Sequence, residues 1–450
     1  MSLTWKQRSI GVVGLLVVLF ALLLELRPSA APGIGPYQIM LLWFGIALAI
    51  VGFARLDSIL FNLSLMILSL AVLIILLELA APWLQRTLPV PQSMTLPDPL
   101  LGSRYRPNFS GHDARGWRNP SALETANIVA IGDSQTWGVN AAVDETWSAG
   151  LSDLTGLSVY NMARGGYGAV QYVQLAEEAL ELDPQTIVVA LYFGNDIADA
   201  YRIVYSIDAY ADMRELSPED MAFEYDISRE ATRQLRQYWD FENRLIQQYT
   251  TPSLASRIRN DTALGQLLDG RNAWPNWINT QYDLNSVADT IAAEQDNFAW
   301  DMPIYYGADN ITFFTPNYRW VALRQDDPRT LEGLRITQIS LSQIQRLTAA
   351  NDIQFLLVLI PTKELVYADV MMRQDGSLST DYERLVADET VMRQAIINFL
   401  DTESIAWVDS LSALQDRIGE ALYLPSTDGH PAPLGYRVIA EIVAAAIDNR

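Results

Sequence analysis

Asn127-Ile128-Val129-Ala130-Ile131-Gly132-Asp133-Ser134 joins a short apolar run to a Gly-Asp-Ser tripeptide. The apolar run is typical of a short buried strand, and the residues after Ser134 predict a turn that opens a helix. A serine at the carboxyl end of a strand is held exposed there. Its backbone N–H and the helix N-terminus face any negative charge that develops on a bound ligand. Alone, Gly-Asp-Ser is a weak signal, because so short a motif recurs by chance.

Three further segments follow in the chain. The Gly-rich run Arg164-Gly165-Gly166-Tyr167-Gly168 comes after an apolar stretch, and such a turn lets backbone N–H groups approach a ligand closely. Gly194-Asn195-Asp196 directly follows the buried-strand pattern 186–193, where an Asn side chain offers an N–H donor. Asp428-Gly429-His430-Pro431 precedes the apolar helix that closes the chain.

Together the four segments resemble the blocks of the SGNH hydrolases, also called the GDSL esterase/lipase superfamily, over roughly residues 110–450. Matched residue by residue, the signature positions are Ser134, Gly166, Asn195 and His430. The resemblance implies Ser134 as nucleophile and His430 as general base. It also implies an oxyanion hole formed by the Ser134 N–H, the Gly166 N–H and the Asn195 amide.

The acid of the triad departs from the family pattern. Many members carry an Asp three residues before the His, and that position is Thr427 here. Asp428 lies two residues before His430, so we expect Asp428 to orient the ring through a tight turn at Gly429, with a Ser134–His430 dyad as the alternative. The other histidine, His112, lies in a polar stretch and is interpreted as a solvated loop residue.

Short apolar strands alternate with helices after residue 126, which predicts a parallel sheet covered on both faces. Five strands suit a flavodoxin-like, doubly wound α/β sheet, the fold that the resemblance also implies. Strands are expected near 127–132, 157–161, 186–193, 353–360 and 405–409, and helices near 168–182, 330–350, 388–400 and 433–448.

An inserted subdomain is expected at about 200–329, with a helix near 228–249 and a strand near 311–323. Its tryptophans Trp239, Trp274, Trp277 and Trp320 could stack on sugar rings, but a role in the insertion's own core is favoured. A smaller insertion is expected near 364–388. Lys363, just before it, is interpreted as a surface salt-bridge residue rather than as a contact to a substrate anion.

The first 86 residues read as a membrane anchor with three transmembrane helices, near 10–24, 37–54 and 59–77, each close to the length that a bilayer requires. A signal peptide is the alternative for the first. Lys6, Arg8 and Arg55 place the N-terminus in the cytoplasm and the region after the third span outside. Residues 87–126 are expected to form a linker and lead-in loop, and 127–450 the SGNH hydrolase-like domain.

The formal net charge of -22 argues against a nucleic-acid partner, because phosphate binding needs clustered Lys and Arg. The chain has no cysteine, which excludes disulfides, thiolate–metal sites and cysteine nucleophiles. No cofactor and no metal are predicted.

The leading hypothesis is a membrane-anchored, extracytoplasmic serine esterase that removes a small acyl group, such as acetyl, from an envelope or extracellular glycan or another ester. One alternative is an O-acyltransferase that modifies a polysaccharide with the help of a membrane acyl-donor partner. The other is a catalytically idle structural subunit of a membrane complex.

Overall fold

The computed structural model describes residues 5–23, 36–53, 94–109, 111–222, 302–307 and 310–448, with a few isolated positions between them. The chain divides into two units. One comprises Met1–Ser93 with Thr250–Pro275, and the other comprises Met94–Tyr249 with Asn276–Arg450. The predicted boundaries at 86 and 126 stay predictions.

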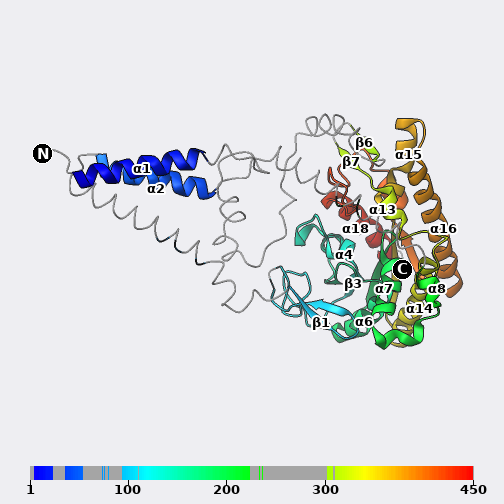
Figure 1. Ribbon diagram of the computed structural model, residues 1–450. Helices are drawn as coiled ribbons and strands as arrows, with labels where there is room; N and C mark the ends of the chain where they lie inside the picture. Colours follow the sequence, from blue (N-terminus) through cyan, green and yellow to red (C-terminus); the bar gives the residue numbers. More distant parts are fainter. Residues whose placement is uncertain are drawn as a thin grey trace. The chain divides into compact units, whose positions relative to one another are not determined.

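Two helices make up the described part of the first unit, α1 (Trp5–Leu23) and α2 (Pro36–Phe53) (Figure 1). They pack with their backbones close together, because a Cβ atom on Gly14 would lie 2.4 Å from the Ala49 backbone nitrogen. Among the residues described, no helix combines the length and the apolar character that crossing a membrane requires. The third predicted span, 59–77, falls almost entirely outside the described residues.

A five-stranded parallel sheet forms the centre of the second unit, as the sequence predicted. The strand order is β4-β3-β5-β8-β9, the flavodoxin-like arrangement in which the first strand of the sheet lies between the second and the third. The strands are β3 (Ile128–Gly132), β4 (Val159–Ala163), β5 (Thr186–Tyr192), β8 (Gln354–Ile360) and β9 (Ala406–Asp409).

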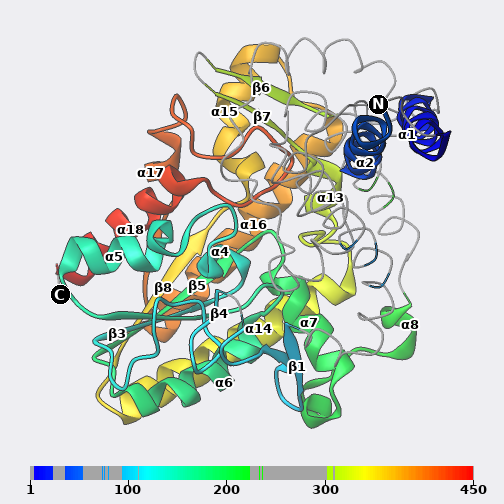
Figure 2. The same ribbon diagram turned by 90° about the vertical axis from the view of Figure 1, so that its left-hand side faces the viewer.

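Alternate residues of each strand enter two separate cores, because successive side chains of a strand point to opposite faces. On one face, Val129, Val189 and Leu357 pack in the core that α6, α14 and α16 cover; on the other, Ala130 and Val188 pack beneath α5 and α18. Figure 2 shows the sheet between these two helical layers. The buried runs of β5 and β8 are apolar without interruption because both of their faces are covered.

The helices around the sheet agree with the predicted positions but exceed them in number. They are α4 (Ser134–Trp137), α5 (Trp147–Thr155), α6 (Ala169–Ala179), α7 (Asp196–Ser206), α8 (Pro218–Met221), α13 (Pro316–Trp320), α14 (Pro328–Ala350), α15 (Lys363–Asp375), α16 (Thr380–Glu403), α17 (Leu411–Gln415) and α18 (Pro433–Asp448), with 3₁₀ turns η2 (Val143–Glu145), η3 (Leu180–Leu182) and η4 (Asp208–Met213). The segment 364–388, expected as a smaller insertion, forms α15 and the start of α16, and its buried side chains share a third core with α17.

Two small hairpins complete the described second unit, β1 (Thr95–Asp98) with β2 (Gly102–Tyr105) and β6 (Ile304–Tyr306) with β7 (Ile311–Phe313). The strand expected over 311–323 is therefore only three residues long, and Pro316 begins α13 instead. The expected helix at 228–249 and three of the four tryptophans lie outside the described residues. Trp320 donates a hydrogen bond to Asp388 on α16 over 2.7 Å, so it packs between helices.

Candidate active site

Ser134 begins α4 at the carboxyl end of β3, where the sequence placed it. The cap of this short helix is Asp133 rather than Ser134, because the Asp133 carboxylate accepts the Gln135 N–H at 2.8 Å. The Ser134 hydroxyl therefore does not cap this helix. It lies 3.1 Å from the Asp133 carboxylate and is half-buried, within reach of other groups at this edge of the sheet.

Ser134, His430 and Asp428 lie in hydrogen-bond contact, although Ser134 and His430 are 296 positions apart in the chain. The Ser134 Oγ atom lies 2.7 Å from His430 Nε2, and His430 Nδ1 contacts the Asp428 carboxylate. A donor at Nδ1 leaves Nε2 as the acceptor that a general base needs. The same carboxylate accepts the backbone N–H of His430 at 3.0 Å, which fixes the carboxylate and the ring to one turn.

The charge of Asp428 is stabilised by its surroundings. Burial acts to raise the pKa of this carboxyl, but the His430 ring, hydrogen bonds from His430 and the Arg319 guanidinium hold the pKa well below its usual range. Thr427, the position where many family members carry the acid, is buried and contributes no carboxylate. The geometry thus brings Asp428, and not a backbone carbonyl, to His430 Nδ1.

Gly429 is needed for a different reason from the one expected. Its φ lies outside the left-handed region, so the turn demands no special backbone conformation. A Cβ atom there would lie 2.5 Å from a terminal nitrogen of Arg319 and 3.0 Å from the Tyr192 hydroxyl. Glycine therefore lets the turn pack against these two side chains, and Gln135 donates to its carbonyl at 3.4 Å.

The Gly-rich turn after β4 also reaches the nucleophile. A Cβ atom on Gly165 would lie 3.4 Å from the Ser134 Cβ atom, and Gly166 has a φ of +79°, a conformation that favours glycine. Asn195, after β5, occupies the N-cap position of α7, and its side chain makes no capping hydrogen bond there. The three predicted oxyanion residues thus come from the carboxyl ends of β3, β4 and β5, which are neighbours in the sheet. Their role in binding an oxyanion stays a prediction.

A buried carboxylate orients the Asn195 amide. Asn195 Nδ2 donates to Asp199 over 2.6 Å, and Asp199 is also paired with Arg202 at 2.5 Å. Burial raises the pKa of Asp199 to about 6, and burial also raises the pKa of Asp133, which lies beside the Asn195 amide. Because amide oxygen and nitrogen are told apart by their partners, the contact to Asp199 identifies the face of Asn195 that carries the donor.

We expect Asn195→Ala to lower kcat by about 10²–10³ with little change in KM, because an oxyanion donor acts mainly in the transition state. Steady-state kinetics on a chromogenic ester would measure both constants. Asn398→Ala, at a position on α16 away from the sheet's carboxyl edge, serves as the control. A change confined to KM would make Asn195 a ground-state binding residue instead.

Two buried acids predict how stability depends on pH. Burial raises the pKa of Asp199 to about 6 and that of Glu389, which accepts the Thr362 N–H at 2.9 Å, to about 7. Both groups bind protons more tightly in the folded than in the unfolded chain, so stability rises as the pH falls from about 8 towards 5. We expect a higher Tm at pH 5.5 than at pH 8 by calorimetry. Glu389→Gln should flatten that dependence, and an unchanged slope would contradict it.

Several residues that sequence reasoning missed organise the site. Arg118 donates to the carbonyls of Trp137, Gly138 and Ala141 at 2.7–2.8 Å, which anchors the end of α4. His112 is not a solvated loop residue, because its Nε2 accepts the Trp137 indole N–H at 3.2 Å. No local sequence pattern predicts such contacts.

Lys363 is likewise not a surface residue. Its side chain is fully buried, and it donates to backbone carbonyls of the turn that carries Asp428. The position of Lys363, three residues after the end of β8, was the one available signal, because the carboxyl ends of parallel strands face the site.

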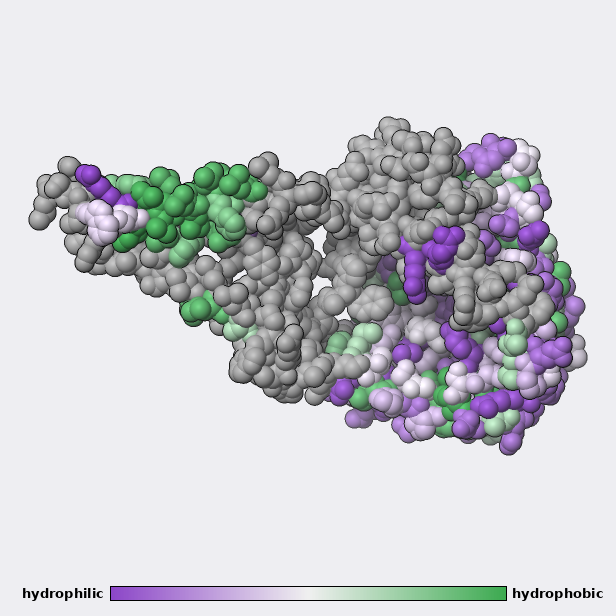
Figure 3. Space-filling model, viewed as in Figure 1, coloured by the Kyte–Doolittle hydropathy of each residue, from purple (hydrophilic) through white to green (hydrophobic). Residues whose placement is uncertain are grey.

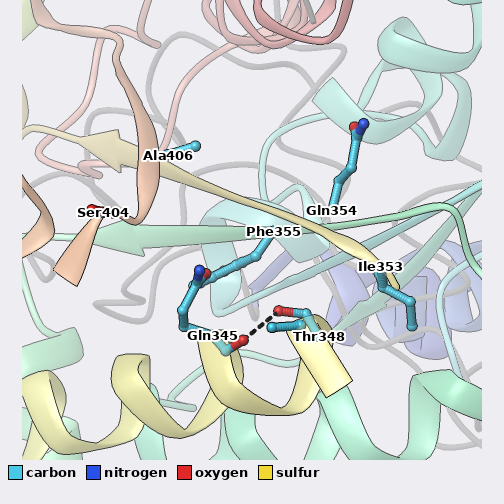
Figure 4. A pocket seen from close by; sticks show the side chains of 8 residues that line it. Gln345, Thr348, Ile353, Gln354, Phe355, Ser404 and Ala406 are labelled. Carbon is cyan, nitrogen blue, oxygen red and sulfur yellow. Dashed lines mark hydrogen bonds between the residues drawn. The ribbon is translucent and has the colours of Figure 1, made fainter. Parts of the chain in front are cut away.

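A cavity of about 280 Å³ lies at the other edge of the sheet (Figure 4). Its lining includes Ile353 and Gln354 at the start of β8, Ser404 and Ala406 at the start of β9, and Thr348 near the end of α14. These are the amino ends of the strands, whereas the candidate catalytic side chains lie at the carboxyl ends. The cavity is therefore no part of the candidate active site.

Comparison with known proteins links this geometry to a family. Residues 318–450 match the model of the SGNH hydrolase-like domain, acetyltransferase AlgX. The matched segment contains Asp428 and His430 but not Ser134, Gly166 or Asn195. No curated protein matched the chain.

Two solved structures match most of the length of this chain at low similarity. One is a protein assigned to the lipolytic G-D-S-L family from Desulfitobacterium hafniense, with 12% identity, a TM-score of 0.33, and coverage of 71% of this chain and 98% of that one. The other is a catalytic mutant of the acetylxylan esterase Axe2 from Geobacillus stearothermophilus, with 11% identity, a TM-score of 0.32, and coverage of 72% and 95%. Scores this low carry no weight in the assignment.

The matched segment contains the candidate base His430 and the candidate acid Asp428, and Ser134, which lies outside it, contacts His430 Nε2 at 2.7 Å. Residues 318–450 are similar to an SGNH hydrolase-like domain, and the protein is an enzyme of the hydrolase or acyltransferase type.

Proposed function

We propose that the protein is a serine esterase that removes a small acyl group, such as acetyl, from an extracytoplasmic glycan or another ester. The observation that carries the proposal is the 2.7 Å contact between Ser134 Oγ and His430 Nε2, with Asp428 on the other ring nitrogen. No cofactor enters the reaction. The acetyl group is suggested by the acetyltransferase family whose model matches residues 318–450.

In the acylation step, Ser134 Oγ attacks the ester carbonyl carbon while its proton passes to His430 Nε2. The Asp428 carboxylate stabilises the imidazolium. The carbonyl oxygen becomes an oxyanion, which the N–H groups of Ser134, Gly166 and Asn195 would bind. The intermediate then collapses: the bond to the alcohol oxygen breaks, and the His430 proton goes to that oxygen. The alcohol leaves and the acyl group remains on Ser134.

Deacylation repeats these roles with a second nucleophile. A water molecule attacks the acyl carbon and gives its proton to His430 Nε2; collapse returns that proton to Ser134 Oγ and releases the acid. If a sugar hydroxyl takes the place of water, the same steps transfer the acyl group to the sugar. The acetyltransferase named in the family match favours this O-acyltransferase as the second candidate, with a membrane partner supplying the acyl donor.

A fluorophosphonate probe and an acetylated-glycan panel test the proposal on the full chain. The probe should label Ser134, and acetate should be released from at least one glycan. Release of acetate alone supports the esterase, whereas loss of donor acetyl matched by O-acetylation of an added glycan supports the transferase. Absence of labelling and of both reactions would leave the idle structural subunit as the better description.

We also propose that α1 and α2 attach the protein to a membrane with the catalytic domain on the extracytoplasmic side. Apolar side chains are exposed along both helices, with Trp5 79% and Trp43 67% accessible, and Figure 3 shows this surface in green. Exposed apolar surface of this extent is typical of a membrane or protein contact. The close packing at Gly14 suits a helix pair in lipid.

The side of the membrane is predicted from the basic residues Lys6, Arg8 and Arg55. Protease added to intact spheroplasts should cleave within residues 200–330, with a cytoplasmic marker protein as the control for leakage. Protection of that region until lysis would reverse the proposed orientation.

A further inference from the structure

Lys363 lies in the core directly behind the turn that carries the catalytic acid. Its Nζ atom donates to the Asp428 carbonyl at 2.9 Å, to the Ser426 carbonyl at 2.8 Å and to Thr312 Oγ1 at 3.2 Å. An ammonium group has three protons, and three oxygen acceptors converge on it here. The acceptors belong to β7 and to the turn, so one side chain at the start of α15 joins three segments.

The choice of lysine is itself informative. The chain contains two lysines, Lys6 and Lys363, whereas its other basic residues are arginines. Arginine offers a flat fork of donors, while lysine offers a compact charge whose three donors point in different directions. Three acceptors around one point therefore fit lysine and not arginine.

Stability alone is a weak reason for a lysine at this place. The side chain is 0% exposed, and burying an ammonium group carries a desolvation cost that its contacts must offset. The Phe314 and Tyr423 rings lie 5.6 and 5.9 Å from Nζ, so an apolar side chain of the same length would also pack here. An apolar side chain would not make the hydrogen bonds to the turn.

The hydrogen bonds from Lys363 act on the catalytic acid because contacts with other segments hold this turn in place. The Phe313 N–H and Thr312 Oγ1 also donate to the Ser426 carbonyl, each over 3.4 Å, and Lys363 adds the bond to the Asp428 carbonyl. Residues 424–430 belong to no helix or strand of the structure. Lys363 donates to the carbonyls of Ser426 and Asp428. These two residues are also joined by a hydrogen bond, in which the Asp428 N–H donates to Ser426 Oγ at 3.0 Å. Any shift of this pair moves the Asp428 carboxylate relative to His430 Nδ1.

We propose that Lys363 is a positioning residue of the triad, which holds the turn at 426–428 so that the Asp428 carboxylate stays on His430. This inference rests on the serine chemistry proposed above. Because Lys363 is fully buried, it acts through Asp428 and makes no contact with substrate.

Lys363→Met, which keeps the length of the side chain and removes all three donors, gives the first measurement. We expect kcat to fall by about 10–100-fold, since a displacement of about 1 Å at a reacting group costs on that order, with KM changed less than about twofold. Met371→Ala, a large-to-small change at a buried position on the same helix, should lower Tm and leave kcat intact. A folded Lys363→Met variant with wild-type kcat overturns the proposal. If Lys363→Met does not fold, Lys363→Gln is measured instead, under the same criterion.

The absence of cysteine from the chain allows a sharper comparison. Lys363→Cys introduces a single thiol, which is alkylated in the unfolded chain with either 2-bromoethylamine or 1-bromopropane before refolding. The two products have side chains of nearly the same shape, and only the first ends in an ammonium group. Wild-type protein taken through the same treatment is the control.

We expect the aminoethylated protein to have a kcat at least about tenfold above that of the propylated one, at equal helicity by circular dichroism. Equal kcat values in the two folded proteins overturn the role of the donors. Failure of the fluorophosphonate to label the wild type refutes the serine chemistry itself, so the two failures are distinguishable.

Discussion

Replacing Ser134 with alanine is expected to abolish ester hydrolysis and fluorophosphonate labelling while the fold is kept. The hydroxyl is the proposed attacking group, and its 2.7 Å contact to His430 Nε2 places it where that base can take its proton. Loss of a triad member typically lowers kcat by about 10⁴–10⁶. Steady-state kinetics of wild-type and variant proteins purified in parallel, with Tm as the measure of folding, would give this ratio.

Ser152→Ala is the matched control for this experiment. Ser152 lies on α5, where its hydroxyl donates to the Leu157 carbonyl at 2.7 Å, so its loss should affect stability slightly and kcat not at all. Turnover at the wild-type rate in Ser134→Ala would refute the assignment of the nucleophile.

Asp428→Asn is expected to lower kcat by about 10⁴, the loss found for the acid of a well-studied serine protease triad. An amide at this place would present a donor to His430 Nδ1 and so favour the tautomer that carries its proton on Nε2. That tautomer cannot accept the Ser134 proton. The rate of fluorophosphonate labelling gives an independent measurement, because it depends on the activation of Ser134 and not on product release.

Asp416→Asn, at an exposed position at the end of α17, controls for the loss of a carboxylate in the same part of the chain. A loss of less than about tenfold in Asp428→Asn would leave a Ser134–His430 dyad as the working unit. In that case Lys363 would have no carboxylate to position, and the Lys363→Met and Asp428→Asn effects would add independently.

The sheet and the edge that holds the site could be predicted from sequence because both depend on local patterns. Buried strands of a parallel sheet are short apolar runs, and polar residues directly after them, such as Ser134 and Asn195, must lie at one edge. The Asp428–His430 contact could also be predicted, because a spacing of two residues permits a single turn to bring both side chains together.

The residues that hold the site in place could not be predicted in this way. Lys363 and Arg319 act on the Asp428 turn from segments that meet it only in the folded chain, so no spacing in the sequence reveals the contacts. His112 looked solvated because its neighbours in the chain are polar, whereas its ring lies 4.2 Å from that of Tyr105. Burial of polar residues is decided by tertiary packing, which local composition does not report.

The 296 positions that separate Ser134 from His430 have a consequence for the newly made chain. Strands β3, β4 and β5 all lie before residue 193, so the part of the sheet that carries Ser134 is synthesised well before His430. His430 follows β8 and β9 in the chain, so the base is made only after all five strands of the sheet. A stalled or C-terminally clipped chain would therefore contain Ser134 without the base that activates it. Ester cleavage would then report that folding has been completed.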